Sequence, residues 1–266
     1  MKTWRSLPPV ASLLAALVAA SAAPRAGDAP TAVDLKLVLA VDISPSMSAR
    51  EQRVQREGYV AAFRQTRLVD AVRGGAVGRI AVAYVEWAEF PAAVIPWTIV
   101  EDAESAGQFA ARLESLPLRQ ELRTSLSRAL LFSAALLQDP SLAAERSVID
   151  ISGDGPNNSG PTVLGARDAV VAAGIVINGL PIMLDKTGQG FFETRGLDDY
   201  YRDCVIGGAG AFALPVTRLD ALAETIERKL LAEIAAAAIP LRRAAERRER
   251  PADCAIGERM GTPTAR

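Results

Sequence analysis

The chain has 266 residues, half of them hydrophobic, with 30 basic and 31 acidic side chains and no histidine. This length allows one substantial core, and the near-neutral charge excludes the basic surface of a nucleic-acid-binding protein. Without histidine, Ser-His-Asp or Cys-His catalysis and histidine-ligated zinc or iron are excluded, so any chemistry must use carboxylates, hydroxyls, amines and oxygen-binding metals.

The first 22 residues have the layout of a secretory signal peptide. Lys2 and Arg5 precede an apolar run from Val10 to Ala20, and small residues follow it. The run is shorter than the roughly 20 residues that a membrane-spanning helix needs. We therefore expect an exported protein, periplasmic or secreted, with no membrane span in the mature chain. Residues 23–33 would form a linker.

Strands and helices alternate along the rest of the chain. The apolar run Leu35–Val41 predicts a buried strand, and helical spacing predicts a helix over Ser48–Val72. Arg79–Ala88 and Ala92–Val100 predict two strands joined by a short turn, and Pro96 suits an edge position, so we expect an antiparallel hairpin at the sheet edge. The further predicted elements are helices over 101–116, 124–138, 163–173 and 217–238 and strands over 146–152, 175–183 and 210–216.

This alternation predicts an α/β domain with a mostly parallel sheet and helices on both faces. Ligands of such sheets bind beyond the C-terminal ends of the strands. We assign the domain to residues 34–240 and expect residues 241–266, rich in arginine and interleaved acids, to be a polar, disordered tail. Cys204 and Cys254 could form one disulfide in an exported protein, and the sequence leaves this open.

Oxygen-bearing side chains gather where predicted strands end. Asp42, Ser44 and Ser46 follow the first strand at every second position, so three oxygens can converge on one side of an extended turn. Asp154 ends a later strand between two glycines, and Thr124 opens a helix. Two carboxylates and three hydroxyls on one edge of a sheet suit a hard divalent cation such as Mg²⁺.

Each of these residues also has an ordinary structural explanation. A serine before a helix is most often an N-cap, which applies to Ser46 or Ser48, and Thr124 could cap its own helix. The Gly-Asp-Gly sequence around Asp154 is a common turn. Asp150 is a rival carboxylate; if it points into the core, it would support the site rather than bind metal.

Three segments together resemble the von Willebrand factor type A (vWA) domain. VDISPSMS is similar to its DxSxS signature, RTSLSRAL to its second element, whose threonine completes a metal site, and VIDISGDGPNN to its third, an aspartate in a strand-end turn. Order and context agree from about Asp34 to Ala238. SGDGPNN, YYRDCVIGG and GAF also resemble a poorly characterised group of exported bacterial vWA-like proteins. One departure is Ser152-Gly153-Asp154-Gly155, where many members have Thr-Asp-Gly.

The resemblance implies a Rossmann-like vWA fold with a metal-ion-dependent adhesion site (MIDAS). Asp42, Ser44 and Ser46 would form the first ligand group, Thr124 the second and Asp154 the third, some of them acting through water. The cation would be Mg²⁺, Mn²⁺ or Ca²⁺, and its open coordination position would take an acidic side chain of a protein partner. We therefore expect a binding module and not an enzyme.

A polar insertion over residues 185–203 is expected near this site. Its aromatic side chains could shape the choice of partner or simply pack the loop down; they are Phe191, Phe192, Tyr200 and Tyr201.

GDGPNN also resembles the Gly-Asp-Gly-x-Asn-Asp loop of haloacid dehalogenase-like phosphatases, which hold Mg²⁺ and would use Asp42 as nucleophile. Three departures disfavour this alternative. Ser44 stands where that family needs a second acid, Lys186 follows the acidic loop instead of preceding it, and Asn158 replaces the last aspartate of the loop. A vWA fold with a vestigial site is a third possibility.

Overall fold

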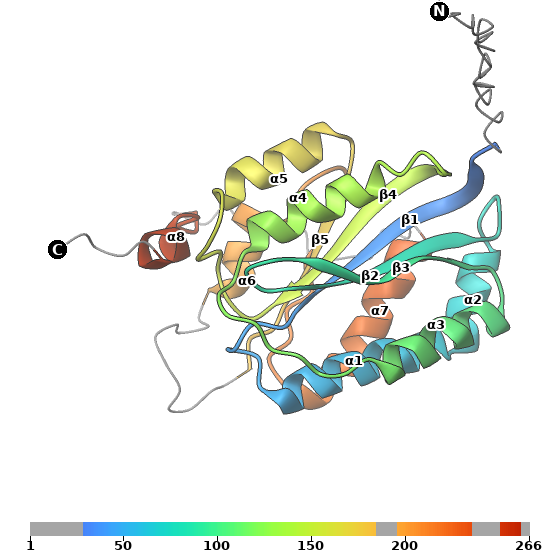
Figure 1. The fold of residues 1–266 in the computed structure, drawn as a ribbon, viewed down its shortest axis with the longest axis horizontal. Helices are drawn as coiled ribbons and strands as arrows, with labels where there is room; N and C mark the ends of the chain where they lie inside the picture. Colours follow the sequence, from blue (N-terminus) through green and yellow to red (C-terminus); the bar gives the residue numbers. More distant parts are fainter. Residues whose placement is uncertain (1–28, 185–195, 236–250, 262–266) are drawn as a thin grey trace, which may run out of the picture.

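One sheet lies between two layers of helices in the computed structural model, which describes residues 29–184, 196–235 and 251–261 (Figure 1). The predicted signal peptide, residues 1–22, lies outside the described residues. The sheet has the strand order β3-β2-β1-β4-β5. Its strands are β1 (Thr31–Asp42), β2 (Ile80–Trp87), β3 (Ala92–Val100), β4 (Leu142–Gly153) and β5 (Val176–Pro181).

The pairing confirms a mostly parallel sheet with one antiparallel edge strand. The central strand β1 is parallel to β2 and β4, β4 is parallel to β5, and β3 runs antiparallel to β2 at the edge. The strand predicted over 210–216 instead forms isolated bridges beside β5, at Ala213 and Val216. Pro181 lacks the N–H group that would donate to Leu214 and extend these bridges into a ladder.

Helices cover both faces of the sheet, as predicted. One face packs against α1 (Ala49–Phe63), α2 (Thr66–Arg73), α3 (Ala103–Ser115) and α7 (Leu222–Ala235); a short 3₁₀ turn, η2 (Leu219–Ala221), leads into α7. The other face packs against α4 (Leu126–Leu137), α5 (Val163–Ala172), α6 (Leu197–Tyr200) and the π-helical turn η1 (Tyr201–Val205).

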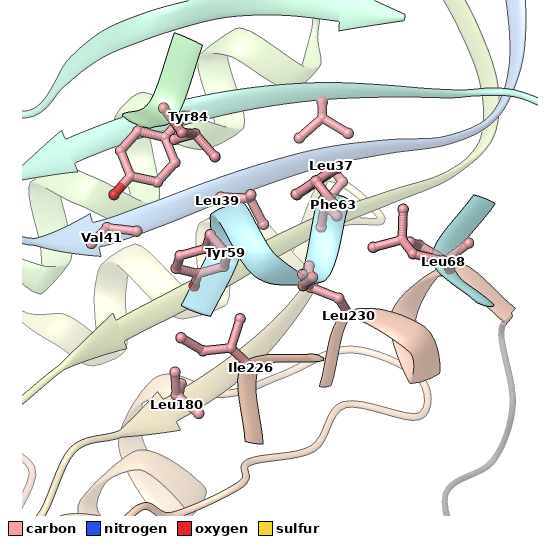
Figure 2. Packing of buried hydrophobic residues seen from close by; sticks show 14 of the residues in the cluster. Leu37, Leu39, Val41, Tyr59, Phe63, Leu68, Tyr84, Leu180, Ile226 and Leu230 are labelled. Carbon is pink, nitrogen blue, oxygen red and sulfur yellow. The ribbon is translucent and has the colours of Figure 1, made fainter. Parts of the chain in front are cut away.

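The alternation of side chains along β1 supplies both cores. Leu37 and Leu39 face α1 and α7, where Tyr59 and Leu230 pack against them (Figure 2), and Val38 faces the α4–α5 layer. A strand buried on both faces reads as a continuous apolar run, which is why its position was predictable.

The helix predicted over Ser48–Val72 is two helices. Gln65 has extended backbone angles (φ −82°, ψ 133°) and separates α1 from α2. The bend lets α2 bury its own apolar side chains, Leu68, Val69 and Val72.

Part of the expected disordered tail is structured. Residues 251–261 include α8 (Ile256–Gly261), and a disulfide joins Cys254 to Cys204 with a Cα–Cα distance of 5.5 Å. The pairing that the sequence left open is therefore formed. The composition of the tail carried no sign of this crosslink, which holds residues 251–261 against the domain. The domain limits stay a prediction.

The described end of the predicted insertion packs onto the domain. Tyr200 and Tyr201 are 4% and 0% exposed, whereas Phe191 and Phe192 lie outside the described residues. In the described part of the chain, no helix is long and apolar enough to cross a membrane.

Candidate metal centre

The loops after β1 and β4 bring four of the predicted ligands together. The N–H of Ser44 donates to Asp42 Oδ1 at 2.7 Å, and the hydroxyls of Ser44 and Ser46 are 2.9 Å apart. Ser46 Oγ donates to Asp154 Oδ1 at 2.6 Å. Because β1 and β4 are parallel neighbours, both loops leave the sheet at its C-terminal edge, where ligands of such sheets bind.

Thr124 is tied to the same edge through Asn158. Its N–H donates to Asn158 Oδ1 at 2.9 Å, and its carbonyl accepts from the N–H of Asn158 at 2.8 Å. Asn158 belongs to the loop that carries Asp154. The structure thus joins Thr124 to the third ligand segment by main-chain and amide contacts.

Other residues take the capping roles that could have explained these hydroxyls. Ser48 caps α1 in a capping box with Glu51, and Ser125 caps α4. The N-cap explanation therefore applies to neither Ser46 nor Thr124. Both serines of the first motif, Ser44 and Ser46, face the carboxylates instead.

Asp42 and Asp154 form an electrostatically unfavourable pair by themselves. Asp42 is fully buried and Asp154 is 4% exposed. Burial, and then the charge of Asp154, raise the pKa of Asp42 to about 8. Asp42 Oδ2 has no hydrogen-bond partner among the described residues. Two facing carboxylates withdrawn from water need a proton or a cation to neutralise them.

The donor set fits a hard divalent cation. The described residues contain no group of three or more His, Cys, Asp or Glu side chains that could hold a metal. A cation between Asp42 and Asp154 would therefore also use the hydroxyls and water. Mg²⁺ accepts this combination, because it keeps several waters and needs only one or two carboxylates.

Gly153 lets β4 pass close to Asp42. A Cβ on Gly153 would lie 2.8 Å from Asp42 Oδ2, 2.9 Å from the Tyr201 hydroxyl and 3.1 Å from the Trp87 ring. A larger residue here would have to displace these side chains, which gives a physical reason for the departure of this loop from the vWA pattern. The sequence placed Tyr201 near the site as part of the insertion, but it did not indicate Trp87, because the nearness of that ring depends on how β2 packs.

The Gly153→Ala variant tests this close approach. We expect the added methyl to displace Asp42, weaken metal binding about tenfold and lower the unfolding free energy by about 1–3 kcal/mol. Calorimetric titration and urea denaturation measure the two effects. Gly155→Ala is the matched control, because a Cβ there meets nothing within 4 Å. Equal losses in both variants would contradict the steric explanation.

The rival carboxylate Asp150 faces the core and not the site. Lys229 Nζ lies 2.6 Å from Asp150 Oδ1 and 2.6 Å from Glu233 Oε1. These three side chains are at most 3% exposed, and Asn178 donates to Glu233 Oε1 at 2.9 Å. Sequence reasoning missed Lys229. The available signal was a lysine on the apolar side of the predicted helix, four residues before a glutamate.

This buried network predicts a pH dependence of stability. Burial, and then the charge of Asp150, raise the pKa of Glu233 from 4.5 to about 8, although Lys229 opposes the shift. The folded state therefore holds this proton more tightly, so the stabilisation is complete below about pH 4.5 and is lost as the pH rises through 8. We expect the unfolding free energy to fall between about pH 5 and pH 8, and less steeply in Glu233→Gln, as measured by urea denaturation.

Glu224→Gln, at an exposed position of α7, is the control for this series. If Glu233→Gln and wild type showed the same slope with pH, Glu233 would not be the group that titrates.

The comparisons with known proteins agree with this fold. The family model described as "Protein of unknown function (DUF1194)" matches residues 32–238. No curated protein matches the chain. Among solved structures, proximal thread matrix protein 1 from the mussel byssus, described with a zinc-occupied MIDAS motif, has 13% identity and a TM-score of 0.58. The alignment covers 77% of this chain and 49% of that chain.

Two bacterial structures are also similar. The pilus adhesin SpaC from Lactobacillus rhamnosus GG has 12% identity and a TM-score of 0.56, over 76% of this chain and 31% of that chain. A von Willebrand factor type A structure from Catenulispora acidiphila has 15% identity and a TM-score of 0.49, over 76% and 43%. The chain thus spans about half or less of these proteins, and identities this low concern the fold alone.

The sheet order, the single antiparallel edge strand and the helices on both faces are those of a vWA-type α/β fold. With a family model that covers most of its length, the chain belongs to the DUF1194 family, a family with the vWA fold.

Proposed function

We propose that this protein is an exported vWA-type module that binds a divalent cation, Mg²⁺ in the first place, and docks a protein partner through it. One observation carries the proposal: the buried carboxylates Asp42 and Asp154 face each other across two serine hydroxyls at the C-terminal edge of the sheet. The proposed ligands are Asp42, Ser44, Ser46, Thr124 and Asp154.

The ligands of the first motif have roles that follow from their contacts. The N–H of Ser44 holds Asp42 Oδ1, which leaves Oδ2 to act toward a cation. Ser44 and Ser46 supply neutral oxygens between the two acids, so the site carries only two negative charges. A bound cation supplies positive charge and an open coordination position for an acidic side chain of the partner. Such binding needs no general base, in keeping with a chain that lacks histidine.

The fold relatives favour a binding module over an enzyme. The mussel protein is described with a MIDAS motif, and SpaC is a pilus adhesin. The phosphatase alternative would need an acid two residues after Asp42, where Ser44 contacts the hydroxyl of Ser46. We therefore do not favour it.

Calorimetric titration of Mg²⁺ and Mn²⁺ into the metal-stripped mature chain tests the proposal. We expect one bound cation in wild type and a loss of more than about 100-fold in affinity in Asp154→Ala, because even the outer partners of metal ligands contribute 10–100-fold. Asp168→Ala, at an exposed position of α5, is the control. A folded wild type that binds neither ion would overturn the metal site, and turnover of a phosphate ester would favour the phosphatase.

A further inference from the structure

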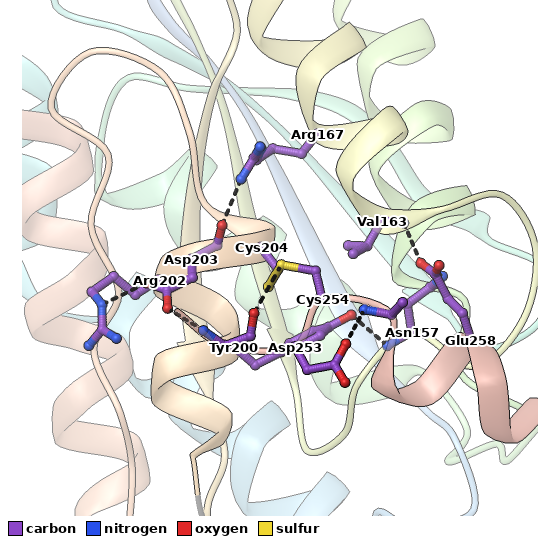
Figure 3. Close-up of a disulfide and its surroundings, with 12 residues drawn as sticks. Asn157, Val163, Arg167, Tyr200, Arg202, Asp203, Cys204, Asp253, Cys254 and Glu258 are labelled. Carbon is purple, nitrogen blue, oxygen red and sulfur yellow. Dashed lines mark hydrogen bonds and ion pairs between the residues drawn. A yellow bond between two sulfur atoms is a disulfide. The ribbon is translucent and has the colours of Figure 1, made fainter. Parts of the chain in front are cut away.

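The C-terminal segment, residues 251–261, lies beyond the part of the chain that the family model matches. We call it the C-terminal strap. Two contacts hold its first half to the turn η1: the disulfide between Cys254 and Cys204, and a hydrogen bond of 2.9 Å from the N–H of Ala252 to Asp203 Oδ2. Figure 3 shows the disulfide, which joins η1 to the strap close to α5, with α8 beyond it.

The second half of the strap holds the loop after β4. Glu258 Oε1 accepts hydrogen bonds from Asn157 Nδ2 at 3.2 Å and from the N–H of Val163 at 2.7 Å (Figure 3). Asn157 is fully buried. The backbone of Gly257 lies so close that a Cβ there would collide with the carbonyl oxygen of Asn157. The strap thus contacts the loop only three residues after Asp154.

Asn157 also contacts other segments around the site. Its Oδ1 accepts from the N–H of Ser127, on α4, at 3.1 Å, and its own N–H donates to the Tyr200 hydroxyl at 3.1 Å. The next residue, Asn158, makes the two hydrogen bonds to Thr124 described above. The loop between β4 and α5 has no regular structure of its own, so these contacts set its path relative to α4.

The disulfide end of the strap reaches the opposite side of the site. Cys204 lies in η1, the turn that carries Tyr201. The hydroxyl of Tyr201 and Asp42 Oδ2 both lie within 3 Å of the position that a Cβ on Gly153 would take. The two anchors of the strap therefore act on the segments that border Asp154 and Asp42.

We propose that the C-terminal strap is a positioning element of the metal site. Glu258 is its main positioning residue: it holds the loop of Asp154 and Asn158 in place, and this fixes Asp154 relative to Thr124. Asn157 Nδ2 also donates to the carbonyl of Pro161 at 2.9 Å, so removal of the Glu258 carboxylate takes the acceptor from one of its two N–H groups and from the N–H of Val163. Buried donors without an acceptor favour other loop conformations. The role at the metal rests on the proposed function, whereas the effect on the loop does not.

Substitutions in the full-length mature chain test the strap. We expect Glu258→Ala to weaken Mn²⁺ binding about tenfold, the range found for outer partners of metal ligands. Glu258→Gln should stay close to wild type, because one oxygen, Oε1, accepts both hydrogen bonds and the amide oxygen can replace it. Gly257→Val should weaken binding by pushing the strap away from Asn157. Met260→Ala, 54% exposed on the same helix, is the control and should change nothing.

Amide hydrogen exchange in metal-free protein separates this inference from the proposed function. We expect residues 153–163 to exchange faster in Glu258→Ala than in wild type or Glu258→Gln. A wild type that binds no cation would overturn the proposed function, but the exchange would still report on the strap. Equal exchange in wild type and Glu258→Ala would overturn the inference, as would an unchanged Mn²⁺ affinity in Glu258→Ala if wild type binds the ion.

Discussion

The Asp42→Asn variant is expected to lose metal binding and yet to be more stable than wild type in metal-free buffer. The neutral amide has the size of the carboxyl group and keeps an oxygen for the N–H of Ser44, but it cannot ionise, so no buried charge can develop beside Asp154. The pKa of Asp42 is raised from 3.8 to about 8 in the folded state, so Asp42 ionises at a lower pH in the unfolded chain than in the folded one. Ionisation therefore stabilises the unfolded wild type first, and the unfolding free energy of wild type falls over this pH range. The advantage of the variant should grow from about pH 4 to pH 8, by at most about 1.4 kcal/mol per pH unit, and then level off.

Added Mn²⁺ should reverse this order. The cation stabilises only the folded wild type by mass action, so wild type gains stability with ion concentration and Asp42→Asn does not. Urea denaturation with chelator and with Mn²⁺, at several pH values, measures both effects, and Asp168→Asn serves as the exposed control. An Asp42→Asn variant that binds Mn²⁺ like wild type, or that is the less stable protein at every pH, would refute the assignment of Asp42.

The Lys229→Met variant should show the largest loss of stability. Lys229 lies between Asp150 and Glu233, and all three are buried. Methionine keeps much of the volume but leaves Asp150 as an uncompensated charge in the core, which costs about 3–5 kcal/mol when one partner of a buried pair is removed. Urea denaturation at pH 7 measures the loss, and Arg228→Met, the exposed neighbour on α7, is the control.

A combined variant distinguishes charge from packing. Lys229→Met together with Asp150→Asn and Glu233→Gln removes all three charges, and such replacements are often close to neutral. We expect it to recover most of the lost stability. If the single Lys229→Met variant were as stable as wild type, the ion pairs of this network would contribute nothing to the fold.

Much of the fold could be predicted because its signals are local. Buried parallel strands are short apolar runs, and Pro96 indicates an edge strand, so the sheet and its antiparallel hairpin followed from the sequence. The division of the first long helix did not, since Gln65 carries no glycine or proline signal. Its backbone turns there because Leu68 and Val72 pack separately into the core.

The candidate site likewise has features that the sequence predicts and features that depend on the tertiary structure. The sequence by itself determined which oxygens are available, their spacing after β1 and the exclusion of histidine chemistry, because these depend on residue types and short distances along the chain. Only the tertiary structure decided that β1 and β4 are neighbours, so that Ser46 meets Asp154 across more than one hundred residues. It also decided the burial that raises the pKa of Asp42.

Long-range contacts account for what the sequence did not reveal. Lys229 pairs with Asp150 between a helix and a strand, and Cys254 and Glu258 reach across to η1 and the loop after β4. The sequence favoured Asp154 as the ligand but left Asp150 as a rival carboxylate. The structure separates them physically: Asp150 faces a buried lysine in the core, whereas Asp154 faces the serines and Asp42 at the edge of the sheet.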